Sequence, residues 1–341
     1  MMKYSNTTRH IKHWLTSLAG LSLLLLLTAC GGSSGGGASY TIGGTVSGMS
    51  GSGLVIKNNG GDNLSITGNG SFTFKTSVAN GGSYSVTVSS HASGQTCRVK
   101  SGSGTVSGSN VTNVAINCGV DPTGYYTGSV TNDTNDITDA QVLVNDTRLM
   151  IVSDAEVVLY DGEMTIIGSD YTATLTVYKN GQKIGTTSAS GSIVKGSQIN
   201  TTTLTGSGYG QGTFVATYDT TYNSRAASLG TIGGTQWAAG LNESLSDYKF
   251  DIDANGNLTH FSNATSLGFR SCQMNGTILP IGTTHLYAVN ITISNCHVNN
   301  ADVDGNFTGL AATKDGVGTD DRLVFTISDG TYSTGDDFIL Q

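Results

Sequence analysis

The sequence predicts an all-β protein, with a small β-sandwich followed by a larger antiparallel meander. Three observations predict this class. Apolar residues come in short alternating runs separated by turn residues, which is typical of strands with one buried face. Glycine is abundant, at 48 of 341 residues, while proline occurs twice and charged residues make up 12%. No segment after the N-terminal region shows the apolar period of an amphipathic helix.

Residues 1–29 have the layout of a bacterial signal peptide. Three basic residues, Lys3, Arg9 and Lys12, precede an apolar run over residues 15–27. That run is shorter than the roughly 20 residues that a transmembrane helix needs. A basic start, an apolar middle and small residues at the end define a cleaved secretory leader.

The end of the leader reads Leu27-Thr28-Ala29-Cys30 and resembles the lipobox of bacterial lipoproteins. The resemblance implies cleavage before Cys30 and attachment of two or three acyl chains, palmitate among them, to that cysteine. Residues 30–39 are then a lipidated cysteine and a flexible Gly/Ser tether. Gly31 stands where the inner-membrane retention signal has Asp, so the expected location is the outer membrane, on its periplasmic face or at the cell surface.

Residues 40–118 are expected to form the sandwich. Asn69-Gly70, between two alternating runs, predicts a β-hairpin, because both residues tolerate the positive φ of a tight turn. Gly-Thr-Val-Ser-Gly, Asn-Gly-Ser-Phe-Thr-Phe and Gly-Gly-Ser-Tyr-Ser-Val-Thr-Val, in this order, resemble an Ig-like module that follows the tether in uncharacterised proteobacterial outer-membrane lipoproteins. The resemblance implies a spacer or display role and no activity.

Residues 124–341 are expected to form one antiparallel domain. Alternation places Tyr171, Ala173, Leu175 and Val177 on one face of a strand. It likewise places Tyr287, Val289, Ile291 and Ile293 on one face of a later strand. Sequential hairpins without a clear crossover favour an up-and-down meander, and closing it removes exposed edges. A lipocalin-like barrel of 8 to 10 strands is the first choice and a larger sandwich the second. The segments from Gly268 onward also resemble the C-terminal domain of such lipoproteins.

Four cysteines remain once Cys30 is lipidated, and an exported protein keeps disulfides. Four cysteines allow three connectivities. Pairing within each domain joins Cys97 to Cys118 and Cys272 to Cys296. A zinc site is the alternative, since histidines lie near the second pair, but the spacing of zinc ligands is missing, so no metal is predicted.

Charge and motifs exclude several functions. Removing the three basic residues of the leader from 16 leaves 13 against 24 acidic residues, a net charge of −11. Without a basic stripe, nucleic-acid binding is disfavoured. Asp251-Ile252-Asp253-Ala254-Asn255-Gly256 begins like an EF-hand loop, but Ser262 occupies the twelfth position, so a turn is expected. The G-x-S-x-G match at residues 32–36 lies in the tether and lacks a strand and helix around it.

No catalytic residues and no cofactor are predicted. His91, His260, His285 and His297 fall in no nucleophile or metal motif. Gly206, Gly208, Gly210 and Gly212 favour a bent strand at a barrel corner, or a ring packed over the glycines, rather than a flat floor for a ligand. Tyr125 and Tyr126 should point to opposite faces of a strand, which would leave one of them outside.

The expected function is therefore a non-catalytic, lipid-anchored envelope protein that binds an unknown partner or displays itself. The alternative is a lipocalin-like carrier of a small apolar ligand in the C-terminal barrel. The two hypotheses predict different interiors for the barrel. A lumen of about 300 Å³ or more with apolar walls favours the carrier, and one filled by its own side chains favours display.

Overall fold

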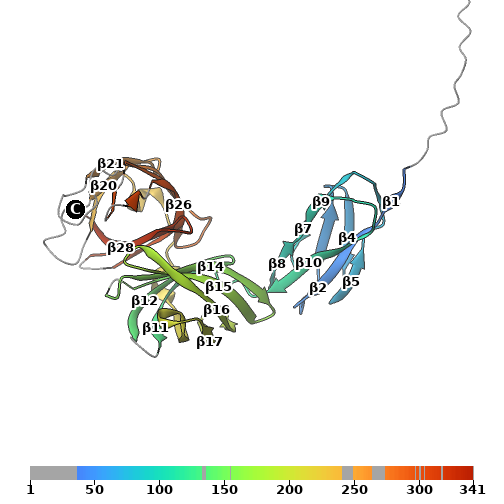
Figure 1. Cartoon of the computed structure of the whole chain (residues 1–341), viewed down its shortest axis with the longest axis horizontal. Helices are drawn as coiled ribbons and strands as arrows, with labels where there is room; N and C mark the ends of the chain where they lie inside the picture. The colour runs from blue at the N-terminus through green and yellow to red at the C-terminus, as the bar shows by residue number, and fades with distance from the viewer. Residues whose placement is uncertain are drawn as a thin grey trace, which may run out of the picture. The chain divides into compact units, whose positions relative to one another are not determined.

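The computed structural model describes residues 37–132, 136–153, 155–239, 249–262, 273–295, 297–298, 301–302, 304–315 and 318–340. The leader, Cys30 and residues 31–36 of the tether lie outside these ranges. Strands dominate the described residues, which confirms the all-β fold class. In Figure 1 the colour runs from blue and teal for the sandwich, through green and yellow for a closed barrel, to orange and red for a second meander.

The sandwich consists of two four-stranded sheets and a short two-stranded ribbon. Its strands are β1 (Ser39–Tyr40), β2 (Ile42–Ser47), β3 (Leu54–Asn58), β4 (Asp62–Ile66), β5 (Gly70–Thr73), β6 (Val78–Ala79), β7 (Ser83–Ser90), β8 (Thr96–Lys100), β9 (Ser103–Thr105) and β10 (Val111–Gly119). One sheet has the order β5-β2-β10-β8 and the other β4-β3-β7-β9, while β1 pairs with β6. Alternating apolar residues of the strands, such as Leu54 and Ile56, are fully buried between the sheets.

The hairpin predicted at Asn69-Gly70 is wrong. The strands before and after it, β4 and β5, belong to different sheets, so the chain crosses the sandwich here. The Asn69 side chain is used elsewhere: its Oδ1 accepts from Met49 N at 2.8 Å and its Nδ2 donates to Met49 O at 2.9 Å. This pair of bonds ties two loops together, a role that local sequence does not reveal.

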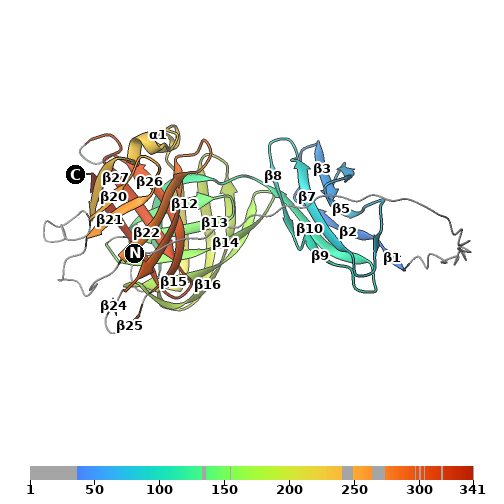
Figure 2. The same cartoon turned by 90° about the horizontal axis from the view of Figure 1, so that it is seen from above.

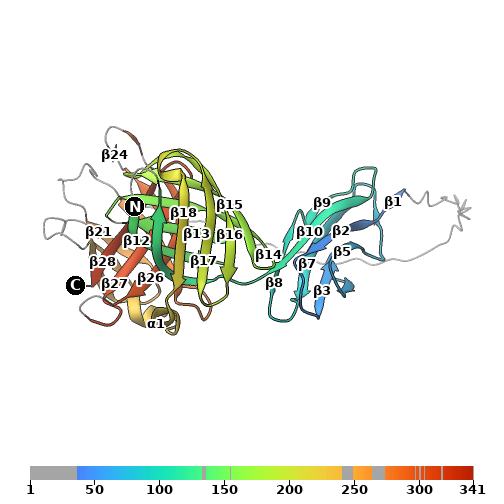
Figure 3. The same cartoon turned by 90° about the horizontal axis from the view of Figure 1, so that it is seen from below.

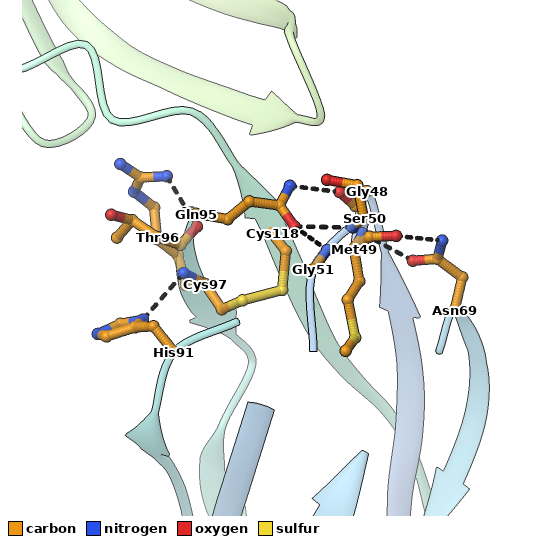
Figure 4. Close-up of a disulfide and its surroundings, with 11 residues drawn as sticks. Gly48, Met49, Ser50, Gly51, Asn69, His91, Gln95, Thr96, Cys97 and Cys118 are labelled. Atoms are coloured by element: carbon orange, nitrogen blue, oxygen red, sulfur yellow. Dashed lines mark hydrogen bonds between the residues drawn. A yellow bond between two sulfur atoms is a disulfide. The ribbon is translucent and has the colours of Figure 1, made fainter. Parts of the chain in front are cut away.

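A disulfide joins Cys97 and Cys118, which confirms the first predicted pair. The two cysteines lie opposite one another on neighbouring strands β8 and β10 and are buried. Figure 4 shows the bond beside the loop of Gly48–Gly51, which Gln95 holds through hydrogen bonds to Gly48 O, Ser50 N and Gly51 N. The disulfide therefore fixes the end of the sandwich from which the chain continues into the barrel.

Replacing both cysteines, Cys97→Ser with Cys118→Ser, is expected to destabilise the sandwich. The bond closes a loop with a sequence separation of 21. A loop of this size is worth about 3 kcal/mol in the chain-entropy account of disulfides. Urea unfolding followed by circular dichroism should show this loss. Wild-type protein kept in reductant serves as the control and should match the double variant. An unchanged unfolding midpoint in both samples would contradict the prediction.

The barrel is closed and contains eight antiparallel strands in sequence order. They are β11 (Gly124–Thr131), β12 (Ile137–Asn145), β13 (Arg148–Ser153), β14 (Val158–Ile167), β15 (Asp170–Lys179), β16 (Gln182–Val194), β17 (Gln198–Thr205) and β18 (Gly212–Tyr218). Pairing of β11 with β18 closes the ring. Figure 3 shows β14 to β18 along the barrel wall. The predicted inward face of β15 is confirmed, since Tyr171, Ala173, Leu175 and Val177 all lie in the interior cluster.

A second eight-stranded meander follows the barrel after two short helices, α1 (Thr220–Asn223) and α2 (Leu229–Ile232). Its strands are β19 (Thr235–Ala239), β20 (Lys249–Ile252), β21 (Leu258–Ser262), β22 (Gln273–Pro280), β23 (Leu286–Ser294), β26 (Gly305–Lys314), β27 (Arg322–Ser328) and β28 (Ser333–Leu340), with a small hairpin of β24 (His297–Val298) and β25 (Ala301–Asp302). The sheet order is β21-β20-β19-β28-β27-β26-β23-β22. Figure 2 shows β20, β21, β22, β26 and β27 grouped together.

The second meander curls until its two edges meet. A single bridge between Asn257 and Thr277, together with a bond from Ile278 N to Gly256 O at 2.8 Å, connects the β21 edge to β22. Its interior cluster contains Trp237, which is fully buried. The sequence predicts one meander over residues 124–341, but the structure contains two. The reason is that the 95 residues from the start of β11 to the end of β18 already complete a ring of eight strands.

An apolar layer joins the outside of the barrel to the outside of the second meander. It contains the following buried residues of both walls: Tyr125, Leu143, Met150, Val152, Leu159, Tyr178, Leu286, Leu310, Ala312 and Val324. The expectation of one buried face per strand is therefore wrong for β13 and β27, whose two faces are both covered. Their continuous apolar runs, Leu149–Val152 and Leu323–Phe325, are the sequence signal for this, because strands buried on both sides do not alternate.

A polar cluster lies at the edge of this layer. Arg148 of the barrel makes two bonds to the Asp161 carboxylate, at 3.0 and 2.9 Å, and two to Thr308 of the second meander, both at 3.0 Å. Asp161 also accepts a hydrogen bond from the hydroxyl of Ser328 on β27. A bidentate arginine–carboxylate pair has a fixed geometry, so this cluster sets the register between the two meanders.

Candidate functional site

The lumen of the closed barrel is filled by side chains of its own strands. The interior cluster contains 22 residues, none of them more than 7% exposed. Its largest members are Tyr126, Tyr160, Tyr171 and Phe214. An eight-stranded barrel has an interior just wide enough for its side chains. The aromatic rings therefore take up the space that a carried ligand would need.

Each of the three interior tyrosines has a partner for its hydroxyl group. Tyr126 donates to Pro122 O at 2.6 Å, Tyr160 donates to Tyr209 O at 2.7 Å, and Tyr171 shares a hydrogen bond with the Thr201 hydroxyl. Burial raises the pKa of Tyr171 to about 12 and also raises the pKa of Tyr126 and Tyr160. The phenols therefore stay neutral and act as fixed donors, as buried tyrosines usually do.

The loop between β17 and β18 covers one end of the barrel. It contains the 3-10 turn η1 (Gly208–Gly210), and the Tyr209 ring packs against the interior cluster. The Tyr209 hydroxyl donates to Glu156 Oε2 at 3.1 Å, and the Lys179 ammonium lies 4.7 Å from the centre of its ring. Lys179 in turn forms an ion pair with Glu156 at 3.3 Å. These contacts fasten the loop to the rim.

The segment between the sandwich and the barrel covers the other end. Gly119 forms a bridge with Gly168 at the β14–β15 turn, and Val120 N donates to Gly168 O at 2.9 Å. Val120 packs against the interior cluster, and Pro122 accepts the bond from Tyr126 described above. Both ends of the barrel are therefore closed by the chain itself.

An open pocket of about 260 Å³, lined mainly by polar and charged residues, lies beside this second end. Its walls come from four turns or strand ends: Asp121 and Thr123 before β11, Lys195 in the β16–β17 turn, Tyr218 at the end of β18, and Thr283–His285 in the β22–β23 turn. Asn223 of α1 forms part of the wall. The barrel and the second meander therefore contribute jointly to this pocket, which is the candidate functional site.

The pocket presents two opposite charges and a neutral phenol. Asp121 Oδ1 accepts from Thr123 N at 3.0 Å and from its hydroxyl at 2.7 Å, which fixes the carboxylate. Lys195 has no hydrogen-bonding or ion-pair partner among the described residues. Burial, and next the charge of Asp121, raise the pKa of Tyr218, so its hydroxyl stays protonated as a donor. The groups suit recognition of a small polar molecule.

A charged cluster supports the back wall of the pocket. His285 is 1% exposed; its Nδ1 contacts Arg225 O at 3.0 Å and its Nε2 contacts Thr313 O. Arg225 makes bonds of 2.6 and 2.8 Å to Asp315 and one of 3.1 Å to Asp320. The Tyr222 ring stacks on His285, with centres 5.9 Å apart. Two carbonyl oxygens facing the imidazole hold the ring in one orientation.

This cluster predicts a pH effect on stability. The hydrogen bonds from Arg225 lower the pKa of Asp315 from 3.8 to about 2. Because the folded value lies below the unfolded value, the contribution is present above pH 3.8 and is lost as pH falls towards 2. Over that interval, wild type should lose more stability than Asp315→Asn. Urea unfolding at both ends of the interval measures this, and equal losses in the two proteins would contradict the prediction.

Some of the predicted site residues lie in the described part of the chain and others lie outside it. Cys30, Cys272 and Cys296 lie outside the described residues, so lipidation and the second disulfide remain predictions. Of the histidines, His285 supports the pocket, and His91 accepts a bond from Cys97 N at 3.0 Å beside the disulfide. The side chains of His260 and His297 fall outside the described set.

The acidic motif at 251–256 forms a turn, as expected. Asp253 Oδ1 accepts from Asn255 N at 2.8 Å and from Asn257 N at 2.9 Å, and Gly256 has a φ of +83°. Bonding to Asn257 lowers the pKa of the Asp253 carboxyl. Among the described residues, no group of three or more His, Cys, Asp or Glu side chains is arranged to hold a metal ion.

Two interpretations of the sequence need correction. The glycines at 206–212 do not form a bent strand: Gly212 begins β18, and the other three build the covering loop. In that loop Gly208 has a φ of +57°, and a Cβ on Gly210 would lie 3.2 Å from Thr187 Cβ. Tyr125 points out of the barrel as expected, but it is 1% exposed because the second meander covers it. Its hydroxyl donates to Gln141 Oε1 at 3.0 Å.

Comparisons with known proteins gave no match. No family model, no curated protein and no solved structure matches the chain. Within the described ranges, no helix has the length and apolar character needed to cross a bilayer. The class that the described residues define is an all-β protein with a filled, closed eight-stranded barrel and a polar pocket outside the lumen.

Proposed function

We propose that this chain is a non-catalytic, lipid-anchored envelope protein that displays its β-modules and binds a partner at their surface. The observation that carries the proposal is the closed barrel, whose interior and both ends are occupied by the chain's own residues. Binding then takes place outside the lumen. The same observation weighs against a lipocalin-like carrier, which needs an accessible cavity with apolar walls.

The anchor is argued from the leader and Cys30. Two or three acyl chains on one cysteine bind a bilayer stably, whereas a single chain binds only marginally. The absence of Asp after Cys30 supports the outer membrane over the inner one. The proposed location at the outer membrane also agrees with a resemblance in sequence. The leader, the tether and the module after them resemble the corresponding segments of proteobacterial outer-membrane lipoproteins.

Mass spectrometry of the N-terminal peptide tests the anchor. In the membrane fraction, we expect a peptide that begins at Cys30 and carries a thioether-linked diacylglyceryl group. The variant Cys30→Ala should keep its leader and carry no acyl chain. Unmodified Cys30 with the leader attached, in soluble wild-type protein, would overturn the proposal.

Protease treatment of intact cells then distinguishes the two faces of the outer membrane. Cleavage of the chain while a periplasmic marker survives indicates the cell surface. Survival of both proteins indicates the periplasmic face. The proposed binding outside the lumen does not depend on which face of the membrane carries the protein.

A further inference from the structure

Opposite charges face the same pocket without pairing with each other. Asp121 and Lys195 both line it, yet no ion pair joins them within the part of the chain that the structure describes. We infer that this pocket binds a small zwitterion of the α-amino acid type. The Lys195 ammonium would meet the ligand carboxylate, and the Asp121 carboxylate would meet the ligand ammonium.

The remaining polar groups of the pocket divide into satisfied and available ones. The Asn223 side chain accepts from Tyr125 N at 2.8 Å and donates to Tyr125 O at 2.6 Å. Thr284 donates its hydroxyl to Ile281 O at 2.7 Å, and both nitrogens of His285 contact carbonyl oxygens. These three residues form a fixed wall and have little left to offer a ligand.

The available groups are on the barrel side. The Tyr218 hydroxyl has no hydrogen-bond partner among the described residues, and its raised pKa keeps the proton in place. It can therefore donate to a carboxylate held by Lys195. Asp121 uses Oδ1 for Thr123 and leaves Oδ2 for a cation. The pocket thus offers two donors for an anion and one acceptor for a cation.

Size and charge together select the ligand class. A pocket of about 260 Å³ is smaller than the 300–1,000 Å³ typical of sites for drug-sized molecules. A simple cation or anion would leave one of the two protein charges without a partner. A neutral sugar would satisfy neither charge fully. A zwitterion carries a partner for each of the two protein charges.

Equilibrium dialysis with radiolabelled glycine tests this inference on the full chain. Glycine carries both charges and no side chain that could clash. N-acetylglycine lacks the ammonium, glycinamide lacks the carboxylate, and glucose lacks both. We expect glycine to bind at millimolar concentrations and the other three to bind about tenfold more weakly or not at all, since each lacks at least one charge-assisted contact.

Substitutions in the pocket test whether glycine binds there. Lys195→Met and Asp121→Asn should each weaken glycine binding about tenfold or more. Lys75→Met and Asp170→Asn are matched controls, because both residues are exposed, have no side-chain partner among the described residues and lie outside the pocket. They should leave binding unchanged. Lys195 lies on an exposed turn, so its variant should fold even if Asp121→Asn does not.

Three results would overturn the inference: no glycine binding, equal binding of any of the three analogues, or unchanged binding by Lys195→Met or by a folded Asp121→Asn. The inference deepens the partner-binding role proposed above and does not depend on the lipid anchor. Failure of glycine to bind would leave the result at Cys30 untouched, and an unmodified Cys30 would leave glycine binding untouched.

Discussion

Phe214→Ala is expected to destabilise the barrel by about 3–5 kcal/mol, the usual cost of removing a buried phenylalanine. Phe214 is 2% exposed and points into the lumen from β18. Its neighbours across the strands, Val130 and Thr201, are themselves buried and paired, so they cannot move in to fill the space. Urea unfolding followed by far-UV circular dichroism measures the loss.

Val215→Ala is the matched control for this variant. Val215 is the next residue on the same strand, points to the outside and is 40% exposed. Its replacement should change the free energy of unfolding by no more than about 0.5 kcal/mol. If the two variants proved equally stable, the lumen would not be packed as described.

Asp161→Asn is expected to lower stability by about 2–4 kcal/mol. The carboxylate accepts two bonds from Arg148 and one from Ser328, and the side chains of the ion pair are 22% and 13% exposed. An asparagine has the same size, but its amide group would face the donors of Arg148. Breaking a largely buried pair leaves the remaining charge uncompensated, at about 3–5 kcal/mol when burial is complete.

The control for this second variant is Asp170→Asn. The Asp170 side chain is exposed and has no partner among the described residues. Surface substitutions of this kind change the free energy of unfolding by no more than about 0.5 kcal/mol. A comparison of urea midpoints should therefore separate the two variants clearly. Equal effects would mean that the Arg148 cluster does not hold the two meanders together.

The sequence predicts the fold class because strand alternation is a local property. The inward face of β15 is read correctly from residues two apart, and so is that of β23, where Tyr287, Val289, Ile291 and Ile293 are all buried. The number of meanders cannot be predicted from local sequence. It depends on where a ring of strands closes, and the pairing of β11 with β18 joins residues about 90 positions apart.

Tertiary contacts also override two local signals. Asn69-Gly70 is a strong hairpin signal, yet the Asn69 amide bonds to Met49 and the flanking strands enter different sheets. Tyr125 alternates correctly with Tyr126, but alternation cannot show that a second meander covers the outer wall. The unbroken apolar run Leu149–Val152 was the available sign of that cover.

The pocket is the part that sequence reasoning missed. Asp121, Lys195, Tyr218 and Thr283 lie in four separate segments and have no motif in common. Each by itself is an ordinary polar residue near a turn. Only the closing of the barrel, and the packing of the second meander against it, bring these residues together.

The central claim is that the barrel is closed and filled, so that the protein binds its partners outside the lumen. Titration of the purified full chain with cis-parinaric acid, a fluorescent apolar probe, tests this claim most directly. We predict no saturable binding to the wild-type protein. Saturable binding of one probe molecule per chain, lost when Phe214→Trp enlarges the interior side chain, would contradict it.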